Sequence, residues 1–279
     1  MKNILSEIKE DKERLVLCFP GVGSAFAKKH FTNSLIIGWN GKAMLVDAGA
    51  GLSRSLDKQG INYEDFDYFH FTHSHEDHVG DVQQILYRHK YLAQRKPKIL
   101  ITREYRGELW DNTLRGGARM NEYNGRNLVF EDYAEFIHPD IVHKRPIYNV
   151  DIDGLNLRLF KTIHEPGGCT KIEEAFWCNG LVIEYNDKKI LWSGDTTFDP
   201  NMFMEINNSY DYAQSPYDAI FHDCDIGGYA VVHASYKDLL TMDNKNRIHL
   251  MHYGDDYETV DAIEDGFAGF TKEWEIFRY

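Results

Sequence analysis

The six residues from His73 to His78, which read HSHEDH, constrain the fold more than any other part of the sequence. Four of them are potential metal ligands: His73, His75, Asp77 and His78. The stretch follows the apolar run 66–71, so a strand that ends here and gives way to a helix would bring these side chains to one rim. Imidazole and carboxylate groups together suit zinc, manganese or iron. The alternative is a polar loop in which the histidines occur by coincidence.

Three further candidate ligands each follow an apolar run downstream: His164, Asp195 and His252. The ends of neighbouring strands meet at one edge of a sheet, so these side chains are expected near the first four. Seven ligands are too many for one tetrahedral zinc ion, but they suit two ions that share a carboxylate. If Asp195 bridges the ions, they lie roughly 3.5–4 Å apart and bring the pKa of a shared water towards neutrality.

Apolar runs and turn residues predict a layered α/β architecture for the chain. The dipeptide Asn40-Gly41 between the β-type runs 34–38 and 43–47 predicts a hairpin. Helical patterns follow Gly49, Val79 and Ser235, and further β-type runs extend to residue 251. Asp47 ends one of the strands, where it could cap the next helix or support the metal ligands from behind.

The segment from about residue 90 to 150 has a different composition, rich in arginine, tyrosine, asparagine and glycine. It shows no independent core pattern, so we predict one domain over residues 1–279 with an insertion or lid here. The arginines and tyrosines of this segment could grip an anionic ligand or a second subunit. A solvated surface element is the alternative. The loop Gly21-Val22-Gly23 also has two interpretations, since its backbone could approach a ligand or form an ordinary turn.

Composition excludes several classes of protein. The 279 residues carry a formal net charge of −13, which argues against a surface that tracks a large nucleic acid. No stretch approaches the ~20 apolar residues that cross a bilayer, and the charged start does not resemble a signal peptide. Four scattered cysteines suggest reduced thiols in a cytoplasmic protein, with Cys169 and Cys224 close in sequence to candidate site residues.

The order and spacing of these ligands resemble the metallo-β-lactamase superfamily, with Asp47 matching its first motif. The resemblance covers most of the chain. It implies an αβ/βα sandwich of two mixed sheets flanked by helices, with the metal ions at one edge of the sheets. It also implies one ion on His73, His75 and His164, and a second ion on Asp77, His78 and His252. The ions would be two divalent cations, with zinc expected and manganese as the alternative.

Two further motifs resemble the ribonuclease Z-like branch of this superfamily. The first is the opening segment 14–26, which is followed by Asn33-Ser34. The second is Asp223 followed by His233, an acid–histidine pair for which the branch has glutamate in place of Asp223. A departing alkoxide needs a proton, so His233 held by Asp223 is predicted as the catalytic acid, with Asp77 also assigned to catalysis. A structural hydrogen bond between the two is the alternative.

Within this branch the chain is most similar to cyclic-nucleotide phosphodiesterases. In size and opening motif it resembles the compact phage-encoded enzymes that destroy cyclic pyrimidine nucleotides of the Pycsar defence. The resemblance implies a small anionic nucleotide as substrate, a homodimer, and action in the cytoplasm, which is the host's if a phage encodes the chain. The alternatives are a tRNA 3′-end nuclease, a lactone or thioester hydrolase, and a non-catalytic nucleotide sponge.

Overall fold

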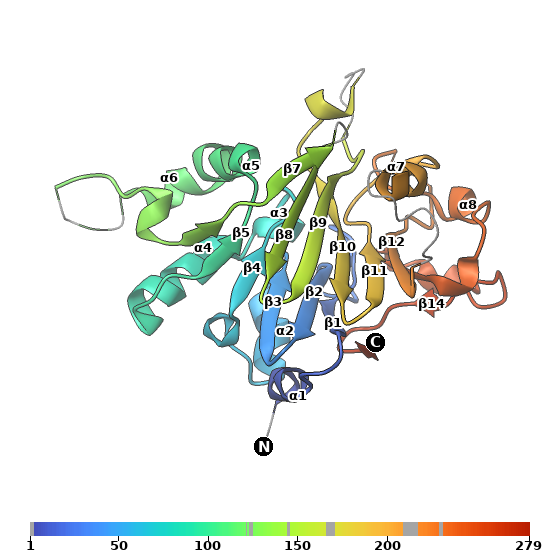
Figure 1. Cartoon of the computed structure of the whole chain (residues 1–279), viewed down its shortest axis with the longest axis horizontal. Helices are drawn as coiled ribbons and strands as arrows, with labels where there is room; N and C mark the ends of the chain where they lie inside the picture. The colour runs from blue at the N-terminus through green and yellow to red at the C-terminus, as the bar shows by residue number, and fades with distance from the viewer. Residues whose placement is uncertain are drawn as a thin grey trace.

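Two β-sheets lie face to face in the computed structural model, with helices at both ends of the pair (Figure 1). The structure describes residues 3–120, 122, 125–143, 146–165, 171–208, 217–228 and 231–279. The predicted architecture of two mixed sheets flanked by helices is confirmed. No helix in the described part of the chain is both long and apolar enough to cross a membrane.

The first sheet has seven strands: β1 (Val16–Gly21), β2 (Ser34–Trp39), β3 (Lys42–Val46), β4 (Tyr68–His70), β5 (Lys98–Leu100), β6 (Glu135–Ile137) and β15 (Ile276–Arg278). Their order is β15-β1-β2-β3-β4-β5-β6. β2 and β3 form the predicted hairpin, in which Trp39 pairs with Lys42. Asn40 and Gly41 have φ of 45° and 78°, the left-handed conformations that such a two-residue turn requires. From β3 to β6 the strands are parallel.

The second sheet has eight strands: β7 (Asp140–His143), β8 (Ile147–Ile152), β9 (Leu155–Lys161), β10 (Asn179–Tyr185), β11 (Lys188–Trp192), β12 (Ala219–Asp223), β13 (Ile248–Met251) and β14 (Gly269–Phe270). They are hydrogen-bonded in chain order from β7 to β14. The strands up to β11 form an antiparallel meander, and β11 to β14 are parallel. β9, β11, β12 and β13 therefore all point towards the same edge.

The helices are short: α1 (Ile4–Glu10), α2 (Leu52–Lys58), α3 (Glu76–Val79), α4 (Val82–Tyr87), α5 (Arg103–Glu108), α6 (Arg115–Ala118), α7 (Met202–Asn208) and α8 (Tyr236–Leu239). π-helical stretches extend α4 over Arg88–Ala93 and α5 over Leu109–Leu114. Figure 1 shows α4, α5 and α6 at one end of the molecule and α7 and α8 at the other. Helices follow Gly49, Val79 and Ser235, as predicted.

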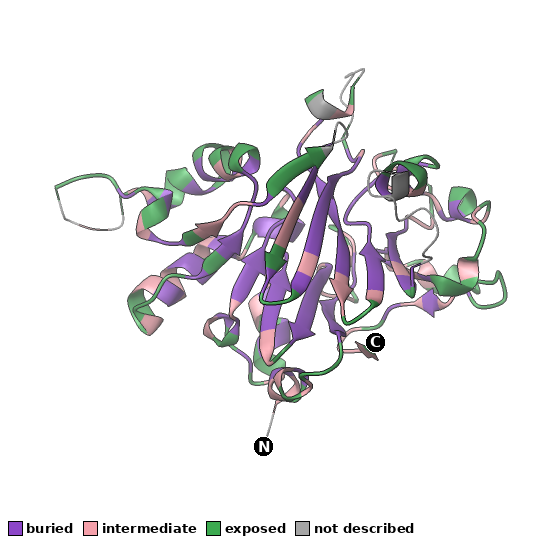
Figure 2. Ribbon diagram, viewed as in Figure 1, coloured by how far each residue is buried: buried purple, intermediate pink, exposed green. Residues whose placement is uncertain are grey.

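One hydrophobic cluster continues through both sheets. The rings of Phe19 on β1 and Phe221 on β12 lie 4.9 Å apart across the interface. The indole nitrogen of Trp39 donates a hydrogen bond to the carbonyl of Ile152 in the other sheet, at 3.1 Å. Figure 2 shows the consequence, since the central strands are buried along most of their length and exposure concentrates on the peripheral helices and loops.

The segment from about 90 to 150, which we predicted as an insertion or lid, contributes to both sheets. β5 and β6 extend the first sheet, while β7 and β8 begin the second. Between β5 and β6 lies the helical part that includes α5 and α6. The role of this helical part as a lid stays a prediction.

Candidate metal centre

The seven predicted metal ligands gather at one edge of the two sheets. His73, His75, Asp77 and His78 lie between the end of β4 and the end of α3, which begins directly after His75. His164 follows β9, Asp195 follows β11 and His252 follows β13. Because these strands end at the same edge, their last side chains converge although they are far apart in the sequence.

Three histidines form what we call the histidine group: His73, His75 and His164. The Nδ1 atom of His75 lies 3.1 Å from Nε2 of His73 and 3.1 Å from Nε2 of His164. His73 and His164 are buried, whereas the side chain of His75 is 34% exposed. Three imidazole nitrogens therefore face one small volume that opens on the side of His75.

Four residues form what we call the carboxylate group: Asp77, His78, Asp195 and His252. The Oδ2 atom of Asp195 lies 3.2 Å from Nε2 of His78 and 3.3 Å from Nε2 of His252. Oδ2 of Asp77 lies 3.3 Å from each of the same two nitrogens. All four residues are buried.

Asp195 connects the two groups. Its Oδ2 atom lies 3.9 Å from Nε2 of His73 and 3.9 Å from Nε2 of His164, in addition to its contacts in the carboxylate group. Among the described residues of the two groups, Asp195 is the one whose carboxylate reaches both, as expected for a residue that bridges two cations.

Each histidine of the histidine group turns its far ring nitrogen towards an oxygen. Nδ1 of His73 lies 2.9 Å from the hydroxyl of Thr72, and Nδ1 of His164 lies 2.9 Å from the carbonyl of Val232. Nε2 of His75 lies 3.3 Å from the carboxylate of Glu165. The Val232 carbonyl and the Glu165 carboxylate can only accept, and the Thr72 hydroxyl already donates to Asp47, so each far nitrogen carries the proton. The near nitrogen keeps its lone pair for a cation.

The histidines of the carboxylate group are held in the same way. Nδ1 of His78 donates to the Asp47 carboxylate at 2.7 Å, and Nδ1 of His252 lies 3.3 Å from Oδ1 of Asp223. Their Nε2 atoms face Asp77 and Asp195. An oxygen behind the far nitrogen is the usual support of a histidine that binds a metal ion, because it fixes the tautomer and the ring orientation.

Buried polar atoms in the centre fit a cation better than they fit one another. Nε2 of His78 and Oδ1 of Asp195 are buried without a hydrogen bond, although charged neighbours lie close. Unpaired buried polar groups are costly, so such atoms call for an additional partner. Nitrogen and oxygen donors in this number and arrangement fit divalent zinc or manganese.

The two groups hold protons differently. Burial and the neighbouring His78 imidazole keep the pKa of His73 well below its usual range, and burial also lowers the pKa of His164. Burial acts in the same direction on His78 and His252, but the Asp195 carboxylate and its acidic neighbours raise the pKa of both well above the usual range. Among the described residues, His73 and His164 are thus neutral imidazoles, whereas His78 and His252 form ion pairs with the carboxylates around them.

Asp223 and His233, the predicted acid–histidine pair, are in contact beside the centre. Nδ1 of His233 lies 2.8 Å from Oδ2 of Asp223. Asp223 lies at the end of β12, is fully buried, and also accepts from the backbone N–H of Thr196 at 3.0 Å. Burial would lower the pKa of His233, but the Asp223 carboxylate raises it above its usual value, which favours the protonated ring. The ring of His233 lies against the histidines of both groups, with ring centroids 4.9 Å from His164 and 4.8 Å from His252.

Two residues of the centre have a left-handed backbone. φ is 60° at Asp47, which follows β3, and 57° at His252, which follows β13. A residue with a side chain pays roughly 1–2 kcal/mol for this conformation. The turn directs the Asp47 carboxylate to His78 and the His252 ring to Asp77. Asp47 does not cap α2, whose first turn follows Gly51, so that alternative for Asp47 was wrong.

Sequence reasoning missed four residues that surround the centre. Thr72 donates its hydroxyl to Asp47, and the thiol of Cys178 lies 3.5 Å from Nδ1 of His73. Glu165 contacts His75, and the ring of Phe176 stacks on His75 with centroids 5.0 Å apart. Thr72 and Glu165 adjoin predicted ligands and could have been suspected for that reason.

The cysteines near the centre differ from those we singled out. Cys178 is the thiol in contact with a predicted ligand, and burial raises its pKa well above the usual range. Cys224 is buried in a separate hydrophobic cluster behind β12. Cys169 lies outside the described residues. Cys18, Cys178 and Cys224 are free and buried, as predicted for reduced thiols.

Comparison with protein families gives one match over most of the chain. The family model described as anti-Pycsar protein Apyc1 matches residues 15–277. A relative of that name from Paenibacillus harenae is 30% identical over 88% of this chain and 90% of its own length. Another, from Bacillus phage vB_BveM-Goe7, is 31% identical over 87% of this chain and 90% of its own length.

Comparison with solved structures shows the fold. The metallo-β-lactamase fold protein YhfI from Bacillus subtilis superposes with a TM-score of 0.70, over 96% of this chain and all of YhfI, at 13% identity. The short form of human tRNase Z gives a TM-score of 0.63 over 94% of this chain and 98% of its own, also at 13% identity. The predicted metallo-β-lactamase fold is confirmed.

Proposed function

Because this chain belongs to the anti-Pycsar protein Apyc1 family, we propose that it is a metal-dependent phosphodiesterase that hydrolyses 3′,5′-cyclic nucleotides to nucleoside monophosphates. Membership of the family confirms the resemblance that the opening segment and the acid–histidine pair predicted. We further propose cyclic pyrimidine nucleotides as the substrates and the removal of a host's Pycsar-type signal as the purpose. The relative from a Bacillus phage supports this role.

The observation that carries the proposal is the shared orientation of five histidines. His73, His75, His78, His164 and His252 each direct one nitrogen to a supporting oxygen and the other into the centre. Two divalent ions, with zinc favoured over manganese by the imidazole-rich donor set, would occupy the histidine group and the carboxylate group. Such ions neutralise a phosphate and make water acidic enough to attack it.

His233 and Asp223 supply the other half of the reaction. Hydrolysis of a cyclic phosphodiester breaks a P–O bond, and the departing ribose oxygen must take up a proton. His233 keeps its Nδ1 proton on Asp223, so Nε2 is the atom that donates. Asp223 holds the ring in place and favours its charged form. Proton donation at Nε2 leaves a neutral imidazole, which remains hydrogen-bonded to the same carboxylate.

A small substrate is also favoured by charge. The net charge of −13 opposes association with a large polyanion, whereas a mononucleotide brings little charge beyond the phosphate that the centre would neutralise. The phosphate of a cyclic mononucleotide needs only the metal groups and one proton donor. A tRNA is therefore the second candidate substrate.

The experiment is an assay of purified, zinc- or manganese-loaded protein with cyclic CMP, cyclic UMP, cyclic AMP and cyclic GMP, followed by separation of the products. We expect linear monophosphate from at least the two pyrimidine nucleotides. A precursor tRNA is assayed in parallel at low and moderate salt, because binding of a polyanion weakens steeply with salt. If none of the four cyclic nucleotides is opened by metal-loaded protein, the proposal is wrong.

A further inference from the structure

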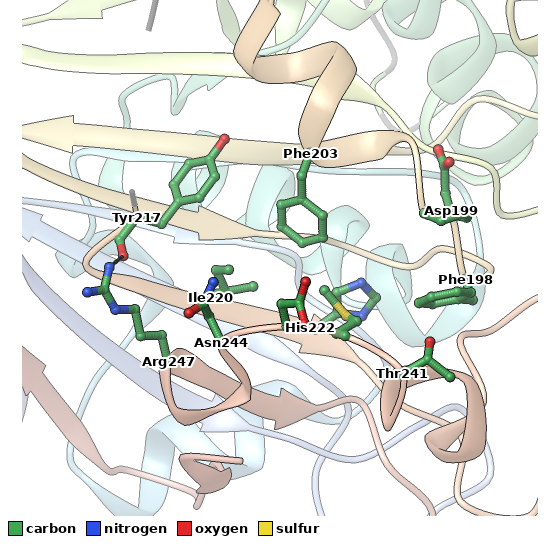
Figure 3. Close-up of a pocket in the computed structure, with 12 residues that line it drawn as sticks. Phe198, Asp199, Phe203, Tyr217, Ile220, His222, Thr241, Asn244 and Arg247 are labelled. Carbon is green, nitrogen blue, oxygen red and sulfur yellow. Dashed lines mark hydrogen bonds between the residues drawn. The ribbon is translucent and has the colours of Figure 1, made fainter. Parts of the chain in front are cut away.

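A cavity separate from the metal centre lies on the opposite face of β12 (Figure 3). Along this strand Phe221 and Asp223 face the interior of the sandwich and the metal centre, whereas Ile220 and His222 line the cavity. The far walls come from α7, from the segment that precedes it and from residues 241–247. The volume is about 670 Å³, within the range of small-molecule sites in proteins.

The walls are mainly aromatic and aliphatic. Phe203 on α7 and Tyr217 before β12 present rings on one side, with centroids 6.3 Å apart. Ile220 packs against two hydrophobic clusters, one that includes Leu239 and one that includes Met202. A flat apolar ring would therefore find packing partners in this cavity.

One buried polar group points into this space. His222 is 1% exposed, and its Nδ1 lies 2.8 Å from the carbonyl of Asp223, so that nitrogen must carry the proton. The other ring nitrogen, Nε2, is then a hydrogen-bond acceptor, and no described residue donates to it. Burial keeps the pKa of His222 below its usual range, which leaves the ring neutral and Nε2 able to accept. A ligand group with an N–H bond would complete it.

Charge is distributed unequally along the cavity. Figure 3 shows Arg247 and Asp199 towards opposite ends, with His222 between them. The Arg247 guanidinium donates to the carbonyl of Tyr217 at 3.1 Å, which fixes the side chain at that end. A guanidinium suits phosphate, and its remaining N–H groups lie on an exposed side chain. Asp243 also lines the cavity, so the site carries both signs of charge.

We propose that this cavity is a second binding site, specific for a nucleoside monophosphate. The base packs against Phe203 and Tyr217 and donates an N–H hydrogen bond to Nε2 of His222, while the phosphate contacts Arg247. The choice of a nucleotide rests on the proposed function, because a nucleoside monophosphate is the product of that reaction. His222 adjoins Asp223, so the strand that carries one wall of this site also carries a residue of the metal centre.

The test is calorimetric titration of AMP, CMP, GMP and UMP, and of the four nucleosides, into chelator-treated wild type and into Asp195→Ala. Both changes remove binding that depends on the metal centre. We expect one equivalent of nucleoside monophosphate to bind in each case. Ile220→Trp, which fills the cavity, should abolish that binding, and Thr241→Trp repeats the test from another wall if the first variant does not fold. In metal-loaded Ile220→Trp, turnover of cyclic nucleotides should stay within about twofold of wild type.

Arg247→Gln should weaken monophosphate binding by about tenfold and leave nucleoside binding unchanged. The control is Arg14→Gln, which replaces an exposed arginine far from Arg247 in the sequence and should alter neither binding. Binding that disappears with chelator or with Asp195→Ala but survives Ile220→Trp would assign the nucleotide to the metal centre and overturn the second site. Absence of binding in every sample overturns it as well. In both cases the assay of cyclic-nucleotide turnover decides the proposed function independently.

Discussion

The histidine group and the carboxylate group share one edge of the sandwich but are built on different principles. The first consists of imidazoles supported by a hydroxyl, a carbonyl and one exposed carboxylate, and it reaches solvent at His75. The second is buried, and its two imidazoles lie between the carboxylates that face them and the carboxylates behind them. Asp195 belongs to the second group, and its carboxylate also reaches the first.

One edge of the sandwich thus presents two clusters of potential metal ligands that differ in charge and burial. Neutral imidazoles can bind a cation without losing a proton, whereas ion-paired imidazoles must release one first. The buried carboxylates also attract a cation more strongly, because charges interact more strongly away from water. We therefore expect the two groups to respond differently to substitution.

Asp195→Ala should impair both groups alike, because it removes the carboxylate that reaches both of them. We expect loss of both ions and a fall in turnover of more than about 10⁴-fold, since the ions contribute several kcal/mol and each 1.4 kcal/mol is a factor of ten. Metal analysis after gel filtration measures the first effect and product formation the second. Asp57→Ala, on an exposed face of α2, is the matched control and should bind metal as wild type does. Two ions retained in Asp195→Ala would rule out a shared ligand.

His233→Ala should leave both groups intact and slow the reaction alone. We expect kcat to fall by about 10²–10⁴-fold with metal content and KM close to wild type, because the variant lacks only the proton donor. Kinetics and metal analysis on the same preparation check this. Equal rates for variant and wild type would remove His233 from the mechanism, and lost metal would make it a structural support.

Asp47→Asn should affect the carboxylate group more than the histidine group, which Asp47 supports only through the Thr72 hydroxyl. The buried Asp47 carboxylate accepts from Nδ1 of His78, and replacement of such a supporting oxygen lowers metal affinity by about 10–100-fold. Competition with a chromogenic chelator should show the affinity for one of the two ions weakened much more than the affinity for the other. Equal weakening of both ions would show that the groups act as one.

Glu165→Gln should have a smaller effect, on the histidine group. The Glu165 side chain is 46% exposed, so solvent screens its interaction with His75. We expect at most a few-fold loss of affinity for the other ion, measured by the same competition. A loss as large as that of Asp47→Asn would mean that burial does not distinguish the groups.

His249 lies outside the two groups and should make the stability of the fold itself sensitive to acid. It lies on β13 in contact with the rings of Phe221 and Phe277, and burial lowers its pKa to about 4. The unfolded chain therefore binds this proton at a higher pH than the folded chain, and the free energy of unfolding decreases as pH falls from about 6.5 to 4. His249→Phe should lose less stability between pH 7 and 5 in urea titrations of metal-free protein. An unchanged pH dependence would contradict this.

Much of the architecture was predictable because local rules and the global fold agree. Asn40-Gly41 is a turn by its own conformational preference, and β13 ends at Met251, where the predicted β-type runs end. The helix predicted to follow Val79 begins at Val82 and continues as π-helix to Ala93. Its apolar spacing indicates the buried face but not the hydrogen-bond pattern, which packing decides.

The candidate ligands could be named from the sequence because each of the seven lies within a few residues of a strand or helix end. The residues around them could not. Cys178 and Phe176 precede β10, a strand that starts at the edge where its neighbours end. The reversal that brings them to His73 and His75 depends on strand pairing, which one sequence does not reveal. For the same reason, the sequence did not show that His222 lies on the face of β12 opposite the metal centre.

The left-handed backbone at Asp47 and His252 lowers the stability of the fold in exchange for the position of two side chains of the metal centre. Glycine at either position would relieve roughly 1–2 kcal/mol of torsional cost, but it would leave a buried partner unpaired, the His78 imidazole at position 47 or the Asp77 carboxylate at position 252. A laboratory selection that rewarded heat resistance alone would therefore replace each residue together with its partner and end with a robust but inert scaffold. Thermostable descendants should therefore be sought with catalysis under selection throughout.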